Sequence, residues 1–192
     1  MVYLLSNLRQ ASDRIMVRIC VLLSKTGLSP SAWTLIGLGL SLLSGLIYSN
    51  ILVRSSALAG LVLLISGFTD MVDGGVARVT NSVSVKGAFL DSTLDRLGEV
   101  FIFAGLLAGS NENQLVIFLA LAFSLTVSYT RARGESLGVK VAGVGIGERA
   151  DRLLALAVLS IIGYPWIGAV VVLALAAITF VQRFFYISSK LP

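Results

Sequence analysis

The segment from Asp70 to Asp95 reads DMVDGGVARVTNSVSVKGAFLDSTLD and places four carboxylates in a chain otherwise dominated by apolar residues. Asp70 and Asp73 are three residues apart, and Asp91 and Asp95 are four apart, so each pair shares one face of a helix. Burial of so much negative charge requires a compensating cation or a water-filled site. The segment therefore predicts two helices whose acidic faces meet to form an oxygen-lined metal site.

The composition around this segment is that of an integral membrane protein. Hydrophobic residues make up 56% of the 192 residues, and the mean hydropathy is +0.92, which is well above the range of soluble globular domains. Residues 26–53, 113–130 and 153–182 contain no charged side chain. Because a membrane-spanning helix needs about 20 mostly apolar residues, these stretches hold several spans. We expect no nucleic-acid partner.

We expect an all-α integral membrane protein with six transmembrane helices in residues 30–192, preceded by an interfacial amphipathic helix in residues 1–29. The expected spans cover residues 30–48, 56–78, 86–109 and 114–133 and a helical hairpin within 153–182 that breaks near Pro165. One face of the N-terminal helix gathers Asn7, Gln10, Arg14, Arg18 and Lys25. Such a helix suits an anionic membrane surface. The single Cys20 is expected to be a small buried residue.

The basic residues predict the orientation of the spans. With six spans, fourteen of the fifteen Lys and Arg residues fall on the side of the two termini, and only Arg54 lies opposite. The positive-inside rule makes that side cytoplasmic. We therefore expect a multi-pass protein of the cell membrane whose termini and acidic segment both face the cytoplasm.

The side chains of the acidic segment favour a hard divalent cation. Carboxylate oxygens suit Mg²⁺ or Mn²⁺, and the chain has no His to support a zinc site. Four carboxylates could hold two such ions beside a phosphoryl group. Gly74, Gly75 and Gly87 leave room for a phosphate to approach the backbone, and Arg78 can pair with it. The alternative, helix-end charges paired with neighbouring basic residues, does not explain why all four carboxylates lie in an apolar chain.

The same segment resembles the complete signature of the CDP-alcohol phosphatidyltransferase family, which is D-x-x-D-G-x-x-A-R, eight further residues and G-x-x-x-D-x-x-x-D. The pattern runs here from Asp70 to Arg78 and from Gly87 to Asp95. The likeness extends over nearly the whole chain. Members of this family displace CMP from a CDP-linked lipid by attack of an acceptor alcohol, so the resemblance implies a transferase with a CDP-lipid substrate. It also implies a homodimer.

The resemblance assigns separate roles to the residues of the segment. The implied metal ligands are Asp70, Asp73 and Asp91, with Asp95 close to the ions and also the general base for the acceptor hydroxyl. The residues implied to bind the CDP moiety are Pro30, Thr34, Asp70, Asp73, Gly74, Arg78, Gly87 and Ser92.

Arginines outside the segment predict a phosphorylated acceptor, because guanidinium groups bind phosphate in a bidentate manner. Residues 128–133 and 148–153 resemble the S-Y-x-x-A-R and E-R-x-x-R-L segments of phosphatidylinositol-phosphate synthases, the family members that use inositol 1-phosphate. Archaeal enzymes that use CDP-archaeol would look much the same. The acceptor-phosphate residues proposed on this basis are Ser128, Arg131, Arg133, Arg152 and Arg183.

Each of these arginines also has a purely structural interpretation. Arg131 has Glu135 four residues away, Arg152 has Glu148 four residues away, and Arg183 lies at a helix end where its side chain would reach toward the interface. The residue at position 131 also departs from the related bacterial enzymes, which carry Lys there. Charge is kept, but the geometry of a phosphate contact differs between Lys and Arg.

The predicted function is transfer of a phosphatidyl-type group from a CDP-activated lipid to inositol 1-phosphate, dependent on two Mg²⁺ or Mn²⁺ ions. The nearest alternative is the same chemistry with glycerol 3-phosphate. A divalent-cation transporter would more often show inverted repeats and a site at the bilayer midplane, whereas this sequence shows no repeat. A purely structural membrane protein would leave the acidic segment unexplained. The sequence does not distinguish acyl from archaeol tails.

Overall fold

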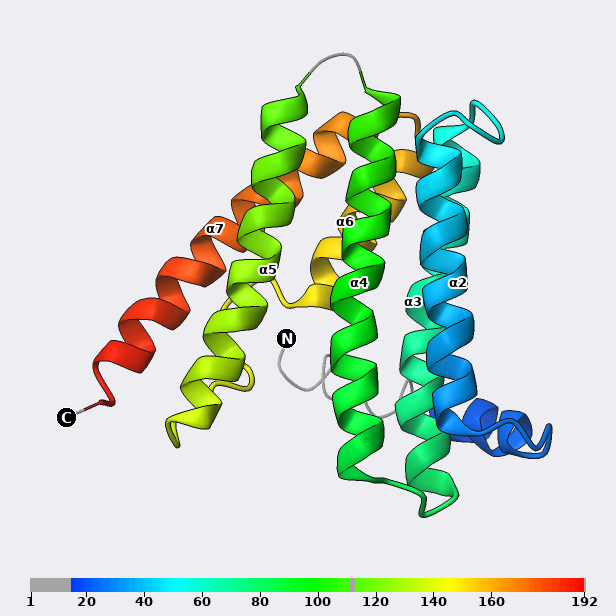
Figure 1. The fold of residues 1–192 in the computed structure, drawn as a ribbon, viewed down its shortest axis with the longest axis vertical. Coiled ribbons are helices and arrows are strands. Elements are labelled where there is room, and N and C mark those ends of the chain that lie inside the picture. Colours follow the sequence, from blue (N-terminus) through cyan, green and yellow to red (C-terminus); the bar gives the residue numbers. More distant parts are fainter. Residues whose placement is uncertain (1–14, 111–112, 192) are drawn as a thin grey trace, which may run out of the picture.

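The computed structural model describes residues 15–110 and 113–191, and all regular secondary structure in these residues is helical (Figure 1). A helix over Ile15–Ser24 precedes six longer elements. These are α2 (Pro30–Tyr48), α3 (Ser56–Val79), α4 (Val85–Gly109), α5 (Gln114–Ser136), α6 (Arg149–Ile161) and α7 (Pro165–Ser188). The all-α prediction is confirmed for the described residues. The main difference in bounds is at α6, which begins four residues before the expected start of the hairpin at position 153.

Local side-chain chemistry explains why the helix bounds agree so well with the sequence. Ser29 precedes α2, and its hydroxyl accepts a hydrogen bond from the Ala32 amide at 3.2 Å, while Pro30 occupies the first turn. Ser55 and Ser84 cap α3 and α4 in the same way. Such caps satisfy amides that the helix itself leaves unpaired. Short, local sequence patterns therefore predict where these helices start.

Four helices are long and apolar enough to span a membrane by length and composition, namely α2, α3, α5 and α7. The six-span prediction is not confirmed. α4 has 25 residues, but residues 85–99 of it carry Lys86, Asp91, Asp95, Arg96 and Glu99. α6 has 13 residues, which corresponds to about 20 Å, whereas the hydrocarbon core is about 30 Å thick. α4 therefore fails the test on composition, and α6 fails it on length.

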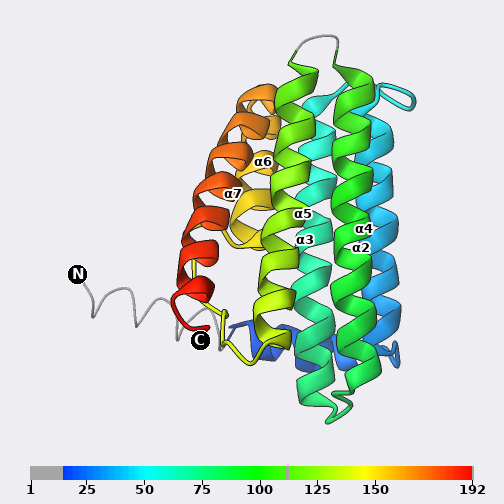
Figure 2. The ribbon, with the colours of Figure 1, turned by 60° about the vertical axis from the view of Figure 1, so that its left-hand side comes forward.

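Close contacts between small residues hold α2, α3 and α4 together, and the ribbons of these helices run side by side in Figures 1 and 2. Gly105 of α4 lies directly against the backbone of Gly45 in α2. Ser41 and Ser66 share a hydrogen bond of 2.8 Å between α2 and α3. Because backbones with small residues approach closely, these three helices form a compact support for the acidic residues.

The helix over Ile15–Ser24 crosses the end of the bundle next to α3 (Figure 2). Cys20 is 1% exposed and packs against Val72 and Val76 of α3, which confirms the expectation for this residue. A side chain at Gly75 would collide with the Cys20 sulfur.

The polar face expected for the N-terminal helix is only partly described. Asn7, Gln10 and Arg14 lie outside the described residues, whereas Arg18 and Lys25 are exposed. Its position at the membrane interface stays a prediction.

Candidate active site

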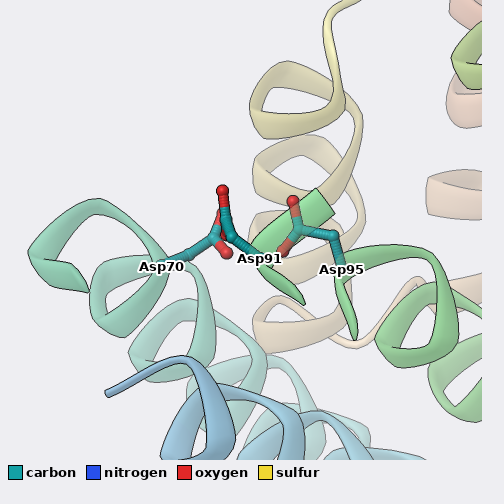
Figure 3. A group of neighbouring side chains, drawn as sticks. All are labelled: Asp70, Asp91 and Asp95. Atoms are coloured by element: carbon teal, nitrogen blue, oxygen red, sulfur yellow. The ribbon is translucent and has the colours of Figure 1, made fainter. Parts of the chain in front are cut away.

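Three carboxylates converge where α3 passes α4 (Figure 3). Asp70 of α3 and Asp91 and Asp95 of α4 each offer an oxygen, and these oxygens lie within 4.8 Å of one another. All three residues are partly buried. An all-oxygen set of carboxylates is what Mg²⁺ and Mn²⁺ prefer, so the residues present fit a divalent cation. We call these three residues the carboxylate cluster.

Asp73 has a different environment from the other three aspartates. It is 4% exposed, and its carboxylate accepts hydrogen bonds from the Thr34 hydroxyl at 2.8 Å and from the Gly74 amide. These bonds tie α3 to the start of α2. In this arrangement Asp73 is not a member of the carboxylate cluster, and its role as a metal ligand stays a prediction.

A groove of about 340 Å³ opens beside the carboxylate cluster, between the ends of α2, α3 and α4. Its volume lies within the range of about 300–1,000 Å³ that is usual for sites of small molecules. The residues that line it are Pro30, Ser31, Thr34, Asp73, Gly74, Ala77, Arg78, Ser82, Val83, Ser84, Gly87, Ala88 and Asp91. The structure thus brings together six of the eight residues predicted to bind the CDP moiety.

The other two predicted CDP residues lie outside this groove. Asp70 belongs to the carboxylate cluster and borders a much smaller cavity of about 10 Å³. The Ser92 hydroxyl donates a hydrogen bond to the Phe89 carbonyl at 3.0 Å, within its own helix. A role of these two residues toward the CDP moiety stays a prediction.

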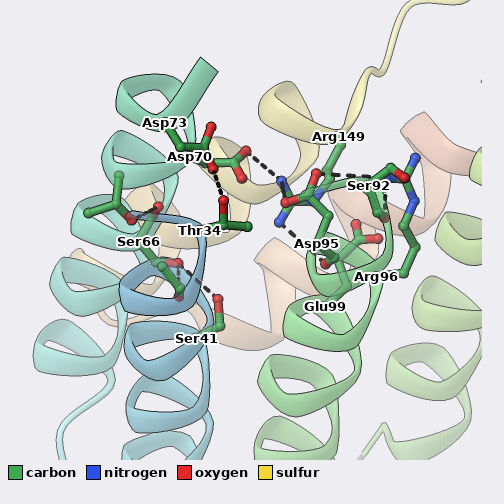
Figure 4. A network of polar contacts seen from close by, with 12 residues as sticks. Thr34, Ser41, Ser66, Asp70, Asp73, Ser92, Asp95, Arg96, Glu99 and Arg149 are labelled. Atoms are coloured by element: carbon green, nitrogen blue, oxygen red, sulfur yellow. Dashed lines mark hydrogen bonds and ion pairs between the residues drawn. The ribbon is translucent and has the colours of Figure 1, made fainter. Parts of the chain in front are cut away.

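Arg149, the first residue of α6, lies within the carboxylate cluster (Figure 4). Its Nη1 is 2.6 Å from Asp70 Oδ2 and 3.0 Å from Asp95 Oδ1, and its Nη2 donates to the Asp95 carbonyl at 3.3 Å. The sequence shows Arg149 only as one of several arginines, because nothing in a linear pattern joins it to acids 79 and 54 residues away.

A second ion pair lies one helical turn deeper and is fully buried. Arg152 of α6 and Glu99 of α4 are 1% and 0% exposed, with Nη2 3.1 Å from Oε1. Arg152 also donates to the Gly147 carbonyl at 2.9 Å. The partner expected for a structural Arg152 was Glu148, whereas the structure pairs it with Glu99. The signal for Glu99 is the spacing of Asp91, Asp95 and Glu99 at intervals of four along α4.

Arg183 of α7 is also buried, with 3% of its surface exposed. Its Nε donates to the Val144 carbonyl at 2.9 Å, and its Nη1 donates to the Val127 carbonyl at 3.0 Å. Arg131 and Arg152 lie close enough to interact with it electrostatically. Arg131, Arg152 and Arg183, from α5, α6 and α7, therefore lie near one another, with Glu135 and Glu148 beside them. We call these three arginines the basic region, and their role toward an acceptor phosphate stays a prediction.

The remaining predicted acceptor residues, on α5, differ in accessibility. Ser128 is buried and donates to the Ser124 carbonyl at 3.3 Å. Arg131 is half-buried, and its Nε lies 3.0 Å from Glu135, the partner expected from the sequence. Arg133 is exposed. Arg131 and Arg133 are thus the acceptor candidates whose side chains remain accessible at the surface.

Residues 27–182 match the family model of the CDP-alcohol phosphatidyltransferases. The chain belongs to this family. The family predicted from the acidic signature is therefore confirmed, and the protein is a transferase of phospholipid synthesis.

Curated relatives extend the likeness over the whole chain. An archaetidylinositol phosphate synthase of Pyrococcus horikoshii is 35% identical over 188 residues, which are 98% of each chain. A phosphatidylinositol phosphate synthase of Streptomyces avermitilis is 38% identical over 148 residues, covering 73% of this chain and 59% of that protein.

Solved structures of one relative share the fold. The phosphatidylinositol phosphate synthase of Mycobacterium tuberculosis with CDP-DAG bound has a TM-score of 0.75 at 27% identity, covering 91% of this chain and 94% of that chain. The same enzyme with manganese and citrate has a TM-score of 0.78 at 26% identity, with 91% and 89% covered.

Proposed function

We propose that this enzyme transfers a diacylglycerol phosphate or archaeol phosphate group from a CDP-activated lipid to a hydroxyl of inositol 1-phosphate, with release of CMP. One observation carries the proposal: the carboxylate cluster shares Asp91 with a groove of nucleotide size, and Arg149, which contacts the cluster, begins the helix that also carries Arg152. The relatives named as synthases of inositol-phosphate lipids support the choice of acceptor.

The groove suits the CDP moiety because it combines small residues with one cation. Gly74 and Gly87 line it without side chains, and Arg78 places a guanidinium at its edge. Asp70, Asp91 and Asp95 would hold one or two Mg²⁺ or Mn²⁺ ions, with Asp73 beside them. The ions would supply positive charge to the diphosphate as negative charge develops on the leaving CMP.

Asp95 is the residue proposed to accept the proton. An oxygen of the acceptor hydroxyl attacks the phosphorus that bears the lipid, the bond from that phosphorus to the CMP oxygen breaks, and the hydroxyl proton passes to the Asp95 carboxylate. CMP leaves with the electron pair of the broken bond. The Asp95 side chain is 14% exposed and is therefore only partly accessible to solvent.

The basic region suits the acceptor phosphate. Ser128, Arg131, Arg133, Arg152 and Arg183 are the residues that we propose for it. Arg131 and Arg133 would meet the phosphate first because they are accessible, whereas Arg152 and Arg183 supply buried positive charge. The proposed setting is a homodimer in the cell membrane, with residues 1–29 at the interface and residues 30–192 as the membrane domain. Both termini and the active site would face the cytoplasm, where a phosphorylated polyol is soluble.

An acceptor-resolved assay tests the proposal. The purified chain is incubated in detergent with Mg²⁺ and CDP-diacylglycerol or CDP-archaeol, and either inositol 1-phosphate or glycerol 3-phosphate is added. We expect CMP and a lipid product with inositol 1-phosphate. Product from glycerol 3-phosphate alone would end the inositol assignment. The Asp95→Asn variant serves as control, because CMP release at the wild-type rate would contradict the proposed base.

A further inference from the structure

We propose that Arg149 is a built-in counter-cation of the carboxylate cluster, whose guanidinium competes with the divalent cation for the same carboxylate oxygens. The proposal rests on the metal site of the proposed function. Its central observation is that two of the three cluster residues, Asp70 and Asp95, already bind one guanidinium at 2.6 and 3.0 Å (Figure 4).

The chemistry of these contacts makes the competition direct. Arg149 Nη1 contacts Asp70 Oδ2 and Asp95 Oδ1 at once, so it lies between the helices where a shared cation would also have to lie. A carboxylate oxygen that accepts a short charge-assisted hydrogen bond presents fewer lone pairs to a metal. A guanidinium and a divalent cation also repel each other strongly in a poorly solvated site. Binding of the metal therefore requires Arg149 to withdraw from at least one carboxylate.

The Arg149 side chain can withdraw without moving the helix, because other contacts hold the start of α6 in place. The Arg152 and Glu99 ion pair docks the first turn of α6 on α4 without help from Arg149. The Gly147 amide donates to the Thr179 hydroxyl at 2.9 Å, which fixes the entry to α6 on α7. These contacts hold the backbone in place while the long side chain of Arg149 changes its partners.

The hydrogen bonding of Arg149 is incomplete in the observed position. Its Nε is buried and has no hydrogen-bond partner among the described residues. The buried Nε of Arg152 also lacks a partner among the described residues, and Arg152 directs its charge at Glu99. Arg149 instead directs its charge at the cluster, which it keeps partly neutralised when no metal is bound.

Arg96 provides a matched comparison. It also faces Asp95, but its Nη1 is 3.7 Å from Asp95 Oδ2, its side chain is 34% exposed, and its stronger contact is with the Ser92 carbonyl at 2.6 Å. Arg96 thus brings the same charge near the same carboxylate without occupying the position between α3 and α4. Its substitution separates direct competition from a general effect of nearby charge.

The test measures binding of Mn²⁺ alone to the full chain in detergent, by electron paramagnetic resonance titration without nucleotide or lipid substrate. We expect Arg149→Gln to bind Mn²⁺ at least about tenfold more tightly than wild type. Arg149→Lys, which keeps the charge, and Arg96→Gln should both remain within about threefold of wild type. Saturable binding to wild type with equal or weaker binding to Arg149→Gln would overturn the proposal and leave the metal site intact.

A second measurement needs no variant. Phenylglyoxal modifies accessible arginines, so Mn²⁺ should increase modification of Arg149 in the wild-type chain while Arg152, in its buried pair, stays protected. Unchanged modification of Arg149 at saturating Mn²⁺ would contradict the competition. Absence of saturable Mn²⁺ binding in wild type and in Arg149→Gln alike would overturn both this inference and the metal site of the proposed function.

Discussion

The carboxylates of the site come from one stretch of 26 residues, whereas the buried arginines bind groups that are far away in the sequence. Asp91 and Asp95 meet on one face of α4 because helix geometry alone puts them there. Arg183 reaches carbonyls 39 and 56 residues away. The placement of Asp91 beside Asp95 is therefore fixed by local spacing, whereas Asp70 joins them and the buried arginines reach their partners only through the packing of the helices.

This difference predicts different responses to substitution. Loss of a carboxylate should affect chemistry and metal binding while the fold survives, because the cluster is partly solvated. Loss of a buried charge should first affect the fold, since a charge without its partner is costly in a low-dielectric interior.

Asp91→Asn should lower the rate of CMP release by about a thousandfold, because several kcal/mol of charge stabilisation by the metal would be lost. The melting temperature should stay near that of the wild type. Transfer assays with CDP-lipid and thermal unfolding in detergent measure the two quantities.

Asp151→Asn is the matched control for this change. Asp151 is exposed, and an Asn at that position retains the oxygen that accepts the hydrogen bond from the Glu148 amide. It should keep its activity. Equal losses of activity in the two variants would contradict a specific catalytic role of the carboxylate cluster.

Glu99→Leu should destabilise the protein by about 3–5 kcal/mol, because it leaves Arg152 buried without its partner. The double variant Glu99→Leu with Arg152→Met should recover much of that stability, since apolar residues of similar size replace the whole pair. Thermal unfolding of the three proteins measures the effect.

The same double variant separates the two roles of Arg152. If Arg152 contributes to the acceptor-phosphate site, the refolded double variant should still show a raised KM for inositol 1-phosphate. A wild-type KM in that protein would make Arg152 a purely structural residue.

Gly105→Ala should destabilise the protein by about 1–3 kcal/mol, because the new methyl group would meet the backbone of Gly45 and force α2 away from α4. Gly39→Ala is the control, since nothing lies within 4 Å of a side chain there. The KM for the acceptor should not change in either variant, because Gly105 lies ten residues along α4 from Asp95. A raised KM without loss of stability would contradict this account of the contact.

Arg131→Lys should give the smallest effect. The pair of Arg131 with Glu135 is exposed, and such pairs contribute about 0.3–0.5 kcal/mol to stability. We expect an unchanged melting temperature and a change of about threefold in the KM for inositol 1-phosphate, because Lys cannot reproduce the bidentate contact of Arg. Glu135→Gln, which removes only the partner, should leave that KM at the wild-type value.

The number of membrane-spanning helices shows where sequence patterns stop being sufficient. Charge-free stretches predict α2, α5 and α7 well, and α3 meets the same test despite the charged residues near its end, because the requirement for apolar residues acts on each helix alone. α4 and α6 also form as helices at nearly the predicted positions, yet one is heavily charged and the other has only 13 residues. Ion pairs with neighbouring helices, such as Arg152 with Glu99, accommodate the charges that the composition of α4 and α6 would not allow in an isolated span.

The sequence by itself determined the helical fold, the helix starts at serine caps and the set of carboxylates, because each depends on residues within a few turns of one another. It also determined the family. Only the tertiary structure decided that Arg149 binds the carboxylate cluster, that Glu99 rather than Glu148 pairs with Arg152, and that Asp73 hydrogen-bonds Thr34. These pairings join residues on different helices, and their geometry exists only once the helices have packed.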